Sequence, residues 1–222
     1  MISSDGWPDL RHERSLWSRG IRYVAGIDEA GRGALAGPVV AAAVILPPDR
    51  GIKRTLCGVR DSKQMRPLER DRWAARIQTV SLSWGVGLAS SEEIDLWGIV
   101  QATRLAMQRA VEGLKPFPEY LLIDFVLLSE CPLPQTAIPK GDLRSLSIAA
   151  ASVLAKTNRD TLMCELDAEF PEYGFAQHKG YSTAAHRDAI QRYGASRIHR
   201  RTFAPLCSRS FDIVPLETGD SL

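Results

Sequence analysis

The pattern of apolar and polar residues along the chain predicts five β-strands. Residues 22–28 alternate between apolar and polar positions and are rich in β-forming side chains, as expected for a strand. Residues 39–46 are apolar at every position, which is typical of a strand buried on both faces of a sheet. Further strands are expected over residues 81–89, 120–127 and 137–140.

Between these strands, apolar residues recur at helical spacing. The clearest case begins at Ser91, where a capping residue is followed by two acids and then by apolar residues about every 3.6 positions up to residue 114. Other helices are expected over residues 9–19, 68–80, 142–170 and 182–192. Small residues at 148–152 predict that their helix packs closely against the sheet. The order of strands and helices indicates an α/β fold whose strands run in mixed directions.

The chain length of 222 residues suits one α/β domain. We expect an N-terminal lead over residues 1–20, the domain itself over residues 21–206 with helices at its C-terminal end, and a loose tail over residues 207–222. The longest apolar run has eight residues, too few to cross a membrane. The first residues do not resemble a secretion signal, so we expect a cytoplasmic protein that binds no membrane. Four widely spaced cysteines, without a C-x-x-C pair, argue against a zinc site.

Charge is distributed unevenly along the chain. The net charge is only +2, but residues 178–209 contain seven Lys or Arg residues and a single acid. The adjacent Arg200 and Arg201 of this segment are expected to contact a phosphate backbone. The remainder of the chain is acidic and could hold a divalent metal ion. The alternatives for the basic segment are a solvated helix surface, or a brace whose arginines pair with acids of the domain.

Several acids lie in apolar surroundings. Asp28 and Glu29 end the first predicted strand, Asp124 lies within the apolar run 120–127, and Asp142 starts a predicted helix. A buried carboxylate is costly unless it is ion-paired, protonated or bound to a metal. Converging acids would repel one another without a divalent cation, and ligands that are all oxygen suit Mg²⁺ or Mn²⁺. The alternatives are ion-paired core acids and, for Asp142, a helix N-cap.

Neighbouring residues on a strand point to opposite faces, so Asp28 and Glu29 can serve one site only if the strand ends there. Gly31 and Gly33 provide such an ending. The same segment matches the dinucleotide-binding pattern G-x-G-x-x-G/A, but it precedes a predicted strand rather than a helix, which argues against that function. The glycines more simply allow backbone N–H groups and Arg32 to approach a polynucleotide.

A series of short motifs follows in order over residues 20–206. They are Gly26-Ile-Asp-Glu-Ala-Gly-Arg-Gly33, Gly37-Pro-Val39, Asp61-Ser-Lys63, Leu122-Ile-Asp124, Lys140-Gly-Asp142, Ser147-Ile-Ala-Ala-Ala-Ser152, Ala155-Lys156, Arg159-Asp160, Lys179-Gly-Tyr181 and His199-Arg-Arg-Thr-Phe203. The series resembles the type 2 ribonucleases H, the ribonuclease HII family. This resemblance implies an RNase H-like fold, an α/β architecture with a five-stranded mixed β-sheet flanked by α-helices.

The resemblance also implies a reaction, the metal-dependent hydrolysis of RNA in RNA–DNA hybrids and of single ribonucleotides embedded in duplex DNA. The products would carry 5′-phosphate and 3′-hydroxyl ends, and the cofactor would be Mg²⁺ or Mn²⁺, acting as a pair of ions. The implied partners are RNA–DNA hybrids and ribonucleotide-containing DNA duplexes, bound by a monomer. The alternatives are a non-catalytic hybrid-binding protein, or a nuclease of the same fold that acts on DNA structures.

By position, the resemblance assigns metal binding to Asp28, Glu29, Asp124 and Asp142. It assigns recognition of the ribose 2′-hydroxyl to Gly31, Arg32 and Gly33, and stacking on the sugar to Tyr181, for which core packing is the alternative. Lys63 would contact the nucleic-acid backbone, and supporting or phosphate contacts would come from Ser152, Lys156 and Asp160. The chain departs from the family pattern at Phe125, usually Gly, and at Ala34, usually Pro. We expect these two departures to affect efficiency and substrate preference.

Overall fold

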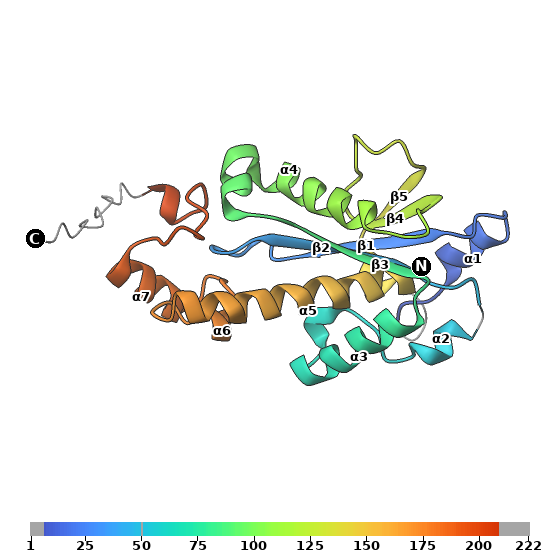
Figure 1. Cartoon of the computed structure of the whole chain (residues 1–222), viewed down its shortest axis with the longest axis horizontal. Coiled ribbons are helices and arrows are strands. Elements are labelled where there is room, and N and C mark those ends of the chain that lie inside the picture. Colours follow the sequence, from blue (N-terminus) through green and yellow to red (C-terminus); the bar gives the residue numbers. More distant parts are fainter. Residues whose placement is uncertain (1–6, 50, 209–222) are drawn as a thin grey trace, which may run out of the picture.

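The computed structural model describes residues 7–49 and 51–208. Its centre is a five-stranded sheet in the order β3-β2-β1-β4-β5 (Figure 1). The strands are β1 (Val24–Ala30), β2 (Val39–Ile45), β3 (Ser83–Ala89), β4 (Tyr120–Asp124) and β5 (Gln135–Ile138). The β2 strand is antiparallel to both of its neighbours, whereas β4 is parallel to both β1 and β5. The expected five-stranded mixed sheet is confirmed.

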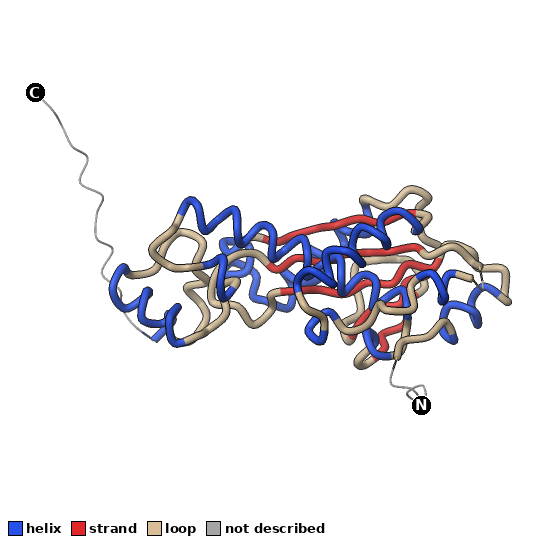
Figure 2. Tube along the Cα trace, turned by 90° about the horizontal axis from the view of Figure 1, so that it is seen from below, coloured by secondary structure: helices blue, strands red, loops and turns tan. Residues whose placement is uncertain are grey.

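Helices cover both faces of the sheet (Figures 1 and 2). One face packs against α4 (Ser91–Glu112) and the other against α5 (Leu146–Glu169), with α3 (Pro67–Val80) beside α5. The shorter helices are α1 (Arg11–Trp17), α2 (Ile52–Thr55), α6 (Phe175–His178) and α7 (Ala184–Tyr193). Three 3-10 turns, η1 (Ser62–Gln64), η2 (Gly141–Leu143) and η3 (Leu206–Ser208), complete the elements. The α6 and α7 helices extend the molecule beyond the end of the sheet.

The β2 strand is buried on both faces, as its apolar sequence predicts. Ala42 and Val44 belong to the core on the α5 side, whereas Ala41 and Ala43 belong to the core on the α4 side. Because successive side chains of a strand point to opposite faces, a strand covered by helices on both sides needs an apolar residue at every position.

The α5 helix approaches the sheet very closely at Gly26 of β1. A Cβ atom added there would lie 2.2 Å from the carbonyl carbon of Ser147 and 2.4 Å from the backbone nitrogen of Ile148. No side chain fits in that space, so glycine is required on the strand. The predicted close packing of the small residues at 148–152 is confirmed, and α5 is held directly against the strand that carries Asp28 and Glu29.

The start of α5 also anchors the N-terminal lead. Ser145 caps the helix by accepting a hydrogen bond from the Ile148 N–H. The buried Glu13 of α1 accepts hydrogen bonds from the Ser145 hydroxyl at 2.6 Å and from the Ser147 N–H at 2.9 Å. A carboxylate beside a helix N-terminus is favoured by the unpaired N–H groups there. This contact joins α1 to the sheet-covering helix.

Several element boundaries differ from the predictions, and two of the differences affect the position of the acids. β4 ends at Asp124 instead of continuing to residue 127, because Phe125 has a left-handed backbone with φ 63° and directs the chain out of the sheet. α5 begins at Leu146 rather than at residue 142, because residues 141–143 form the separate turn η2. Asp124 is therefore the last residue of its strand and not its centre.

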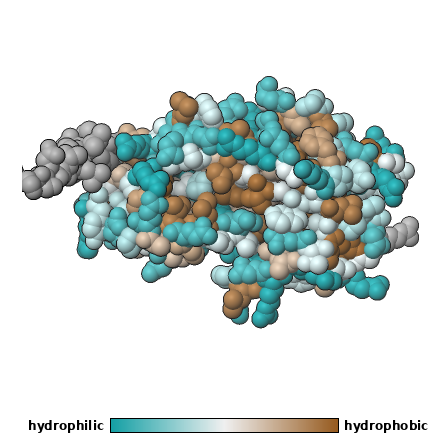
Figure 3. Space-filling view, viewed as in Figure 1, coloured by the Kyte–Doolittle hydropathy of each residue, from teal (hydrophilic) through white to brown (hydrophobic). Residues whose placement is uncertain are grey.

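The surface of the molecule is mixed in character. On the face drawn in Figure 3, hydrophobic side chains form small patches separated by polar residues. Over residues 7–49 and 51–208, no helix combines the length and the hydrophobicity that a membrane crossing requires. Residues 1–6 of the expected lead and residues 209–222 of the expected tail lie outside the described part of the chain.

Candidate active site

Four carboxylates gather where neighbouring parallel strands end. Asp28 and Glu29 lie near the end of β1, and Asp124 ends the parallel strand β4, whose Ile123 pairs with Ile27. Because parallel strands bring their carboxyl ends to one edge of a sheet, these acids lie side by side. Asp142 joins them from η2, the turn that follows β5.

Backbone N–H groups orient two of these carboxylates. The Oδ1 atom of Asp28 accepts a hydrogen bond from the Glu29 N–H at 2.7 Å, and the Oδ1 atom of Asp124 accepts one from the Gly141 N–H at 2.7 Å. A Cβ atom at position 141 would lie 2.6 Å from the Cδ1 atom of Ile148, so this position also needs glycine. The absence of a side chain lets the chain after β5 pass close to Asp124.

The expected strand ending at Asp28 and Glu29 lies further along the chain. β1 continues in register through Ala30, so the side chains of Asp28 and Glu29 leave opposite faces of the strand, although their charges still interact. Gly31, with φ 93°, turns the chain away only after Ala30. The Oε1 atom of Glu29 lies 3.5 Å from the Nη1 atom of Arg32. Glu29 therefore faces the loop after the strand while it remains within electrostatic reach of Asp124.

The four acids repel one another. Burial, followed by the charges of Glu29 and Asp124, raises the pKa of Asp28 well above its usual value. Burial also raises the pKa of Glu29; the Arg32 charge opposes this rise, and the Asp124 charge adds to it. Burial and the charges of nearby acids raise the pKa of Asp142 to about 6. The charges of Arg32 and Lys63 oppose the rise in pKa at Glu29, and Lys63 opposes it at Asp142, but the pKa values of both acids remain raised.

Asp142 is a member of this cluster and not a helix cap. It is 7% exposed and lies in η2, while the N-cap of α5 is Ser145. The competing interpretation of Asp142 as an N-cap of this helix is therefore wrong.

Lys63 and Asp61 border the carboxylates from the turn η1. Burial lowers the pKa of Lys63, but the charges of four acids, Asp28 and Asp61 foremost, raise it above its usual value. Asp61 also helps to raise the pKa of Asp142. No role was predicted for Asp61, although it opens the Asp61-Ser-Lys63 motif. Its carboxylate also accepts the Lys63 N–H at 2.9 Å, which shapes the turn.

The donor set suits a hard divalent cation. All four side chains offer oxygen atoms, and their mutual repulsion is what a bound cation would relieve. In the described part of the chain, no three His, Cys, Asp or Glu side chains are arranged so that they could hold a metal ion. Mg²⁺ and Mn²⁺ ions commonly keep water and substrate phosphate among their ligands, so an open carboxylate group fits them.

The three expected supporting residues lie on the α5 face toward the site. The Ser152 hydroxyl hydrogen bonds to the Ser62 hydroxyl at 2.9 Å and lowers the pKa of Asp28. Asp160 accepts hydrogen bonds of 2.6 Å from both Arg70 and Lys156, so its charge is already paired. Ser152 therefore contacts the carboxylate group, whereas Asp160 holds Lys156 in place.

A buried arginine joins the glycine loop to the segment that carries Tyr181. Arg159 is 0% exposed and donates hydrogen bonds to the carbonyl oxygens of Pro38, Ala36 and Lys179. Its Cζ atom lies 5.3 Å from the centre of the Tyr181 ring. The motif Arg159-Asp160 was quoted from the sequence, but no feature of it indicated that Arg159 would be buried among carbonyl groups.

Arg200 corrects an expectation from the sequence. Its side chain is 0% exposed and donates hydrogen bonds to the carbonyl oxygens of Gly37 at 3.0 Å and Arg32 at 2.8 Å. Burial and the nearby Arg159 charge lower the pKa of Arg200 to about 9. A guanidinium that is enclosed in this way cannot reach a phosphate backbone, so the expected contact of Arg200 is wrong. Its partners are carbonyls, whereas the brace considered above paired arginines with acids.

Comparison with known proteins identifies the family to which the chain belongs. A model of the family described as ribonuclease HII matches residues 25–206, most of the chain. The chain belongs to the ribonuclease HII family. It is 53% identical over 201 residues to the ribonuclease HII of Geobacillus kaustophilus (strain HTA426), covering 90% of this chain and 75% of that protein. It is also 55% identical over 199 residues to the ribonuclease HII of Synechococcus sp. (strain JA-3-3Ab), covering 90% and 89%.

Solved structures show the same fold. The ribonuclease H2 of Pyrococcus horikoshii OT3 is 26% identical with a TM-score of 0.70, covering 83% of this chain and 95% of that one. The RNase HII of Archaeoglobus fulgidus, solved in a complex with PCNA, is 27% identical with a TM-score of 0.69, covering 82% and 95%. The predicted family and RNase H-like fold are confirmed. As a ribonuclease HII, the chain is a metal-dependent endoribonuclease that acts on RNA–DNA hybrids.

Exposed basic residues lie in the C-terminal part of the described chain. In the segment 178–208, Arg187, Arg192, Arg197 and Arg201 are exposed. Arg197 forms an ion pair with Glu169. The backbone N–H of Arg201 donates to Asp95 at 2.8 Å, which fixes the chain there. Arg201 is therefore placed at the surface directly after the buried Arg200.

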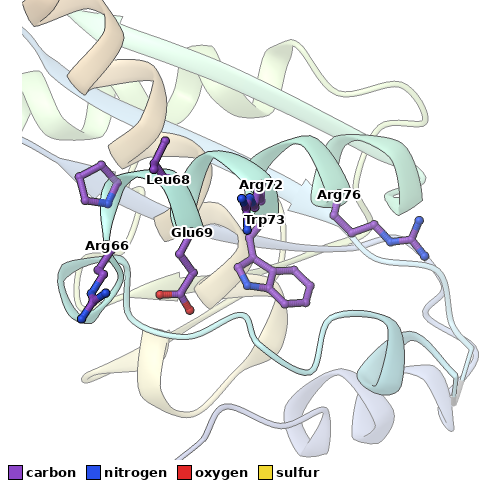
Figure 4. Close-up of a pocket in the computed structure, with 7 residues that line it drawn as sticks. Arg66, Leu68, Glu69, Arg72, Trp73 and Arg76 are labelled. Atoms are coloured by element: carbon purple, nitrogen blue, oxygen red, sulfur yellow. The ribbon is translucent and has the colours of Figure 1, made fainter.

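A separate hollow runs along α3. It is lined by Arg66, Pro67, Leu68, Glu69, Arg72, Trp73 and Arg76. Figure 4 shows the Trp73 ring in this hollow, with Arg66 and Arg76 toward its two ends. None of the four carboxylates lines it, so the hollow is distinct from the candidate active site.

The burial of Arg200 predicts that replacing it affects mainly stability, whereas replacing the exposed Arg201 affects mainly duplex binding. Arg200→Ala should lower the free energy of unfolding by about 2–4 kcal/mol, because carbonyl groups lose their donors and a cavity forms. Arg201→Ala should change stability by less than about 0.5 kcal/mol and should make the slope of log K against log salt shallower by up to about 0.9. Thermal unfolding and duplex binding at several salt concentrations measure both. An Arg200→Ala protein with unchanged stability and a shallower salt slope would contradict this placement.

Proposed function

We propose that this ribonuclease HII cleaves the RNA strand of hybrids, and single ribonucleotides in duplex DNA, with divalent cations held by its four carboxylates. The ligands are Asp28, Glu29, Asp124 and Asp142. The observation that carries the proposal is their convergence, with raised pKa values for Asp28, Glu29 and Asp142 that a bound cation would reverse. We propose Mg²⁺ or Mn²⁺ as the ion, because the donors are all oxygen.

When bound, a pair of such ions supplies an activated water on one side of the phosphorus and stabilises the departing 3′ oxygen on the other. The residues of the chain hold the ligand oxygens in position. The Gly141 N–H orients the Asp124 carboxylate, and the Ser152 hydroxyl and the Glu29 N–H orient Asp28. Preorganised ligands of this kind avoid reorganisation during the reaction. The products would carry 5′-phosphate and 3′-hydroxyl ends.

Selection for ribose is assigned to the loop of Gly31, Arg32 and Gly33 together with Tyr181. Three contacts support this pairing. The Leu35 N–H donates to the Gly180 carbonyl at 2.8 Å, a Cβ atom at Gly180 would lie 2.5 Å from the Ala36 carbonyl oxygen, and Arg159 bridges both segments. A 2′-hydroxyl reader needs backbone close to the sugar, and a stacking ring beside it.

Contacts to the phosphate backbone are assigned to Lys63, Lys156 and Arg201. Lys63 borders the carboxylates, and the Nζ atom of Lys156 lies 5.6 Å from the centre of the Tyr181 ring. Arg201 is exposed at the surface, directly after the buried Arg200 in the sequence. These three cations would flank a duplex whose scissile phosphate lies at the carboxylates. We propose that the protein does this as a monomer.

The metal-site assignment predicts that Asp124→Asn nearly abolishes cleavage while the fold is kept. The substitution preserves the shape of the side chain but removes the ligand charge. The assay uses a duplex with one ribonucleotide, an RNA–DNA hybrid and an all-DNA duplex, each with Mg²⁺, Mn²⁺ or a chelator. Asp71→Asn, which changes an exposed carboxylate on α3, is the matched control and should cleave normally.

Two results would oppose the assignment. Near-normal turnover by a folded Asp124→Asn protein would remove Asp124 from the metal site. Cleavage in the presence of chelator, or equal cleavage of the all-DNA duplex, would contradict the proposed reaction or its selectivity.

The structure of the glycine loop predicts that Gly33→Ala impairs cleavage at a ribonucleotide without disturbing the fold. A Cβ atom at Gly33 meets nothing within 4 Å, so the fold should be unchanged, whereas substrate would meet the added methyl group. We expect kcat/KM at an embedded ribonucleotide to fall at least about tenfold. Gly31→Ala should also lose stability, because its Cβ atom would lie 1.9 Å from the Nε atom of Arg159.

Steady-state kinetics and melting curves of both variants measure these effects. Gly113→Ala, whose Cβ atom would come no closer than 3.6 Å to other atoms, serves as the control. Unchanged cleavage by Gly33→Ala would show that the sugar does not approach the loop at that point.

A further inference from the structure

Buried histidines lie behind the segment that carries Tyr181. His186 of α7 is 0% exposed and His199 is 1% exposed, and their Nε2 atoms are 3.1 Å apart. The ring of His178 stacks on that of His186 with a centroid distance of 4.4 Å. None of these rings contacts the carboxylates of the active site through a recorded hydrogen bond among the described residues. They have no role in the reaction proposed above.

The hydrogen bonds of His199 determine where its proton lies. The Nδ1 atom of His199 lies 2.8 Å from the Ser196 hydroxyl and 3.0 Å from the Ser196 backbone nitrogen. The hydroxyl can donate or accept, but a backbone N–H can only donate. The Nδ1 atom must therefore carry a lone pair. A neutral imidazole has one N–H, so the proton of His199 is on its Nε2 atom.

His186 must have the opposite arrangement. Its Nδ1 atom lies 3.0 Å from the carbonyl oxygen of Tyr181, which can only accept, so Nδ1 carries the proton. The Nε2 atom of His186 is then the acceptor for the Nε2–H group of His199. The result is one continuous chain of donors that runs from Ser196 through His199 and His186 to the carbonyl of Tyr181.

The hydrogen-bonded residues lie next to the proposed ribose site at two places. At the first, the backbone of His199 forms a β-bridge with Ala36, which follows the glycine loop. At the second, the hydrogen bonds end at the carbonyl of Tyr181, which follows Lys179 and Gly180 with their left-handed φ values of 53° and 78°. Such a backbone persists only where its surroundings hold it. The Tyr181 ring is 36% exposed, so it is available to a substrate while its carbonyl is held from behind.

We propose that His186 and His199 are positioning residues that hold Tyr181 in register with the glycine loop through this one-directional chain of hydrogen bonds. The inference rests on the proposed role of Tyr181 in binding the sugar. Neither histidine touches the substrate, and both act through the Tyr181 backbone. A third proton would place two N–H groups face to face, so the chain requires both rings to be neutral.

The environment keeps the rings neutral. Burial, opposed by hydrogen bonds to the backbone and aided by the neighbouring His178, lowers the pKa of His186 to about 4. Burial and the charges that would face it on His186, His178 and Arg201 lower the pKa of His199 to about 3.

Nuclear magnetic resonance of ¹⁵N-labelled wild-type protein tests the chain directly. We expect His186 to carry its proton on Nδ1, His199 to carry its proton on Nε2, and neither ring to titrate between pH 5 and 8, the range in which an unperturbed histidine, with a pKa of about 6.5, would change charge. A proton on Nε2 of His186, or a titration of either ring near pH 6.5, would overturn the proposal.

A double-mutant cycle tests the consequence for cleavage. His186→Leu should lower kcat/KM at an embedded ribonucleotide about tenfold, and His186→Asn should recover most of it, because its side-chain amide can donate to the same carbonyl. In a Tyr181→Ala background, His186→Leu should have less than about a threefold further effect. A merely structural histidine would give losses that multiply and no recovery by Asn, which would overturn the proposal.

The histidine proposal and the metal-site proposal can be overturned independently of each other. If Tyr181→Ala cleaves like the wild type, the sugar-binding role of Tyr181 and the positioning role of the histidines both fail, while metal-dependent cleavage stands. If Asp124→Asn cleaves normally, the metal site fails regardless of the histidines. Melting curves confirm that each variant is folded at the assay temperature, and the resonances of the wild-type rings decide the inference if a variant does not fold.

Discussion

The repulsion among four partly buried carboxylates is the constraint on which this structure depends. Asp28, Glu29 and Asp124 stand at the ends of adjacent parallel strands, and η2 adds Asp142. Like charges in a poorly solvated place are unfavourable, and an isolated chain would separate them. The rest of the fold holds them together. α5 lies directly on β1 at Gly26, and the Gly141 N–H holds Asp124. We propose that a bound cation relieves this repulsion.

Two buried arginines hold together the segments proposed to recognise ribose. Arg159 and Arg200 are both fully buried, and the hydrogen bonds recorded for them among the described residues go to backbone carbonyls. They tie together three segments that are far apart in sequence: the glycine loop, the segment before Tyr181 and residues 198–200. Strand ends thus place the proposed metal ligands, while buried arginines and histidines place the parts proposed to recognise ribose.

Much of the fold follows from local patterns. The all-apolar β2 strand and the small residues of α5 each have a direct physical meaning, and the structure agrees with both. The helix expected from Ser91 is also present, but its capping residue is Ser90 and not Ser91. The acids at the strand ends were also visible, because a carboxylate in an apolar run needs an explanation. Their gathering in space depends on the strand order β3-β2-β1-β4-β5, which neither the local patterns nor the expected five-stranded mixed sheet specified.

The features that the sequence could not reveal depend on contacts between distant segments. Arg200 looks like part of a basic surface, yet its side chain is buried and donates to the carbonyl oxygens of Arg32 and Gly37. Asp61 joins the acids because η1 packs beside α5. At both positions a tertiary contact overrides the local preference of the residue. Phe125 ends β4 through a left-handed backbone that its side chain does not favour.

The central claim is that the folded chain brings carboxylates together at a cost which a metal ion relieves. Denaturant unfolding of wild type and Asp28→Asn at pH 8, with chelator and with saturating Mn²⁺, tests it most directly, with Asp71→Asn as the control. The account predicts that Asp28→Asn has the higher free energy of unfolding in chelator and that Mn²⁺ reverses this order, because the wild type binds the ion more tightly. A lower free energy of unfolding for Asp28→Asn in chelator, or no reversal with Mn²⁺, would contradict it.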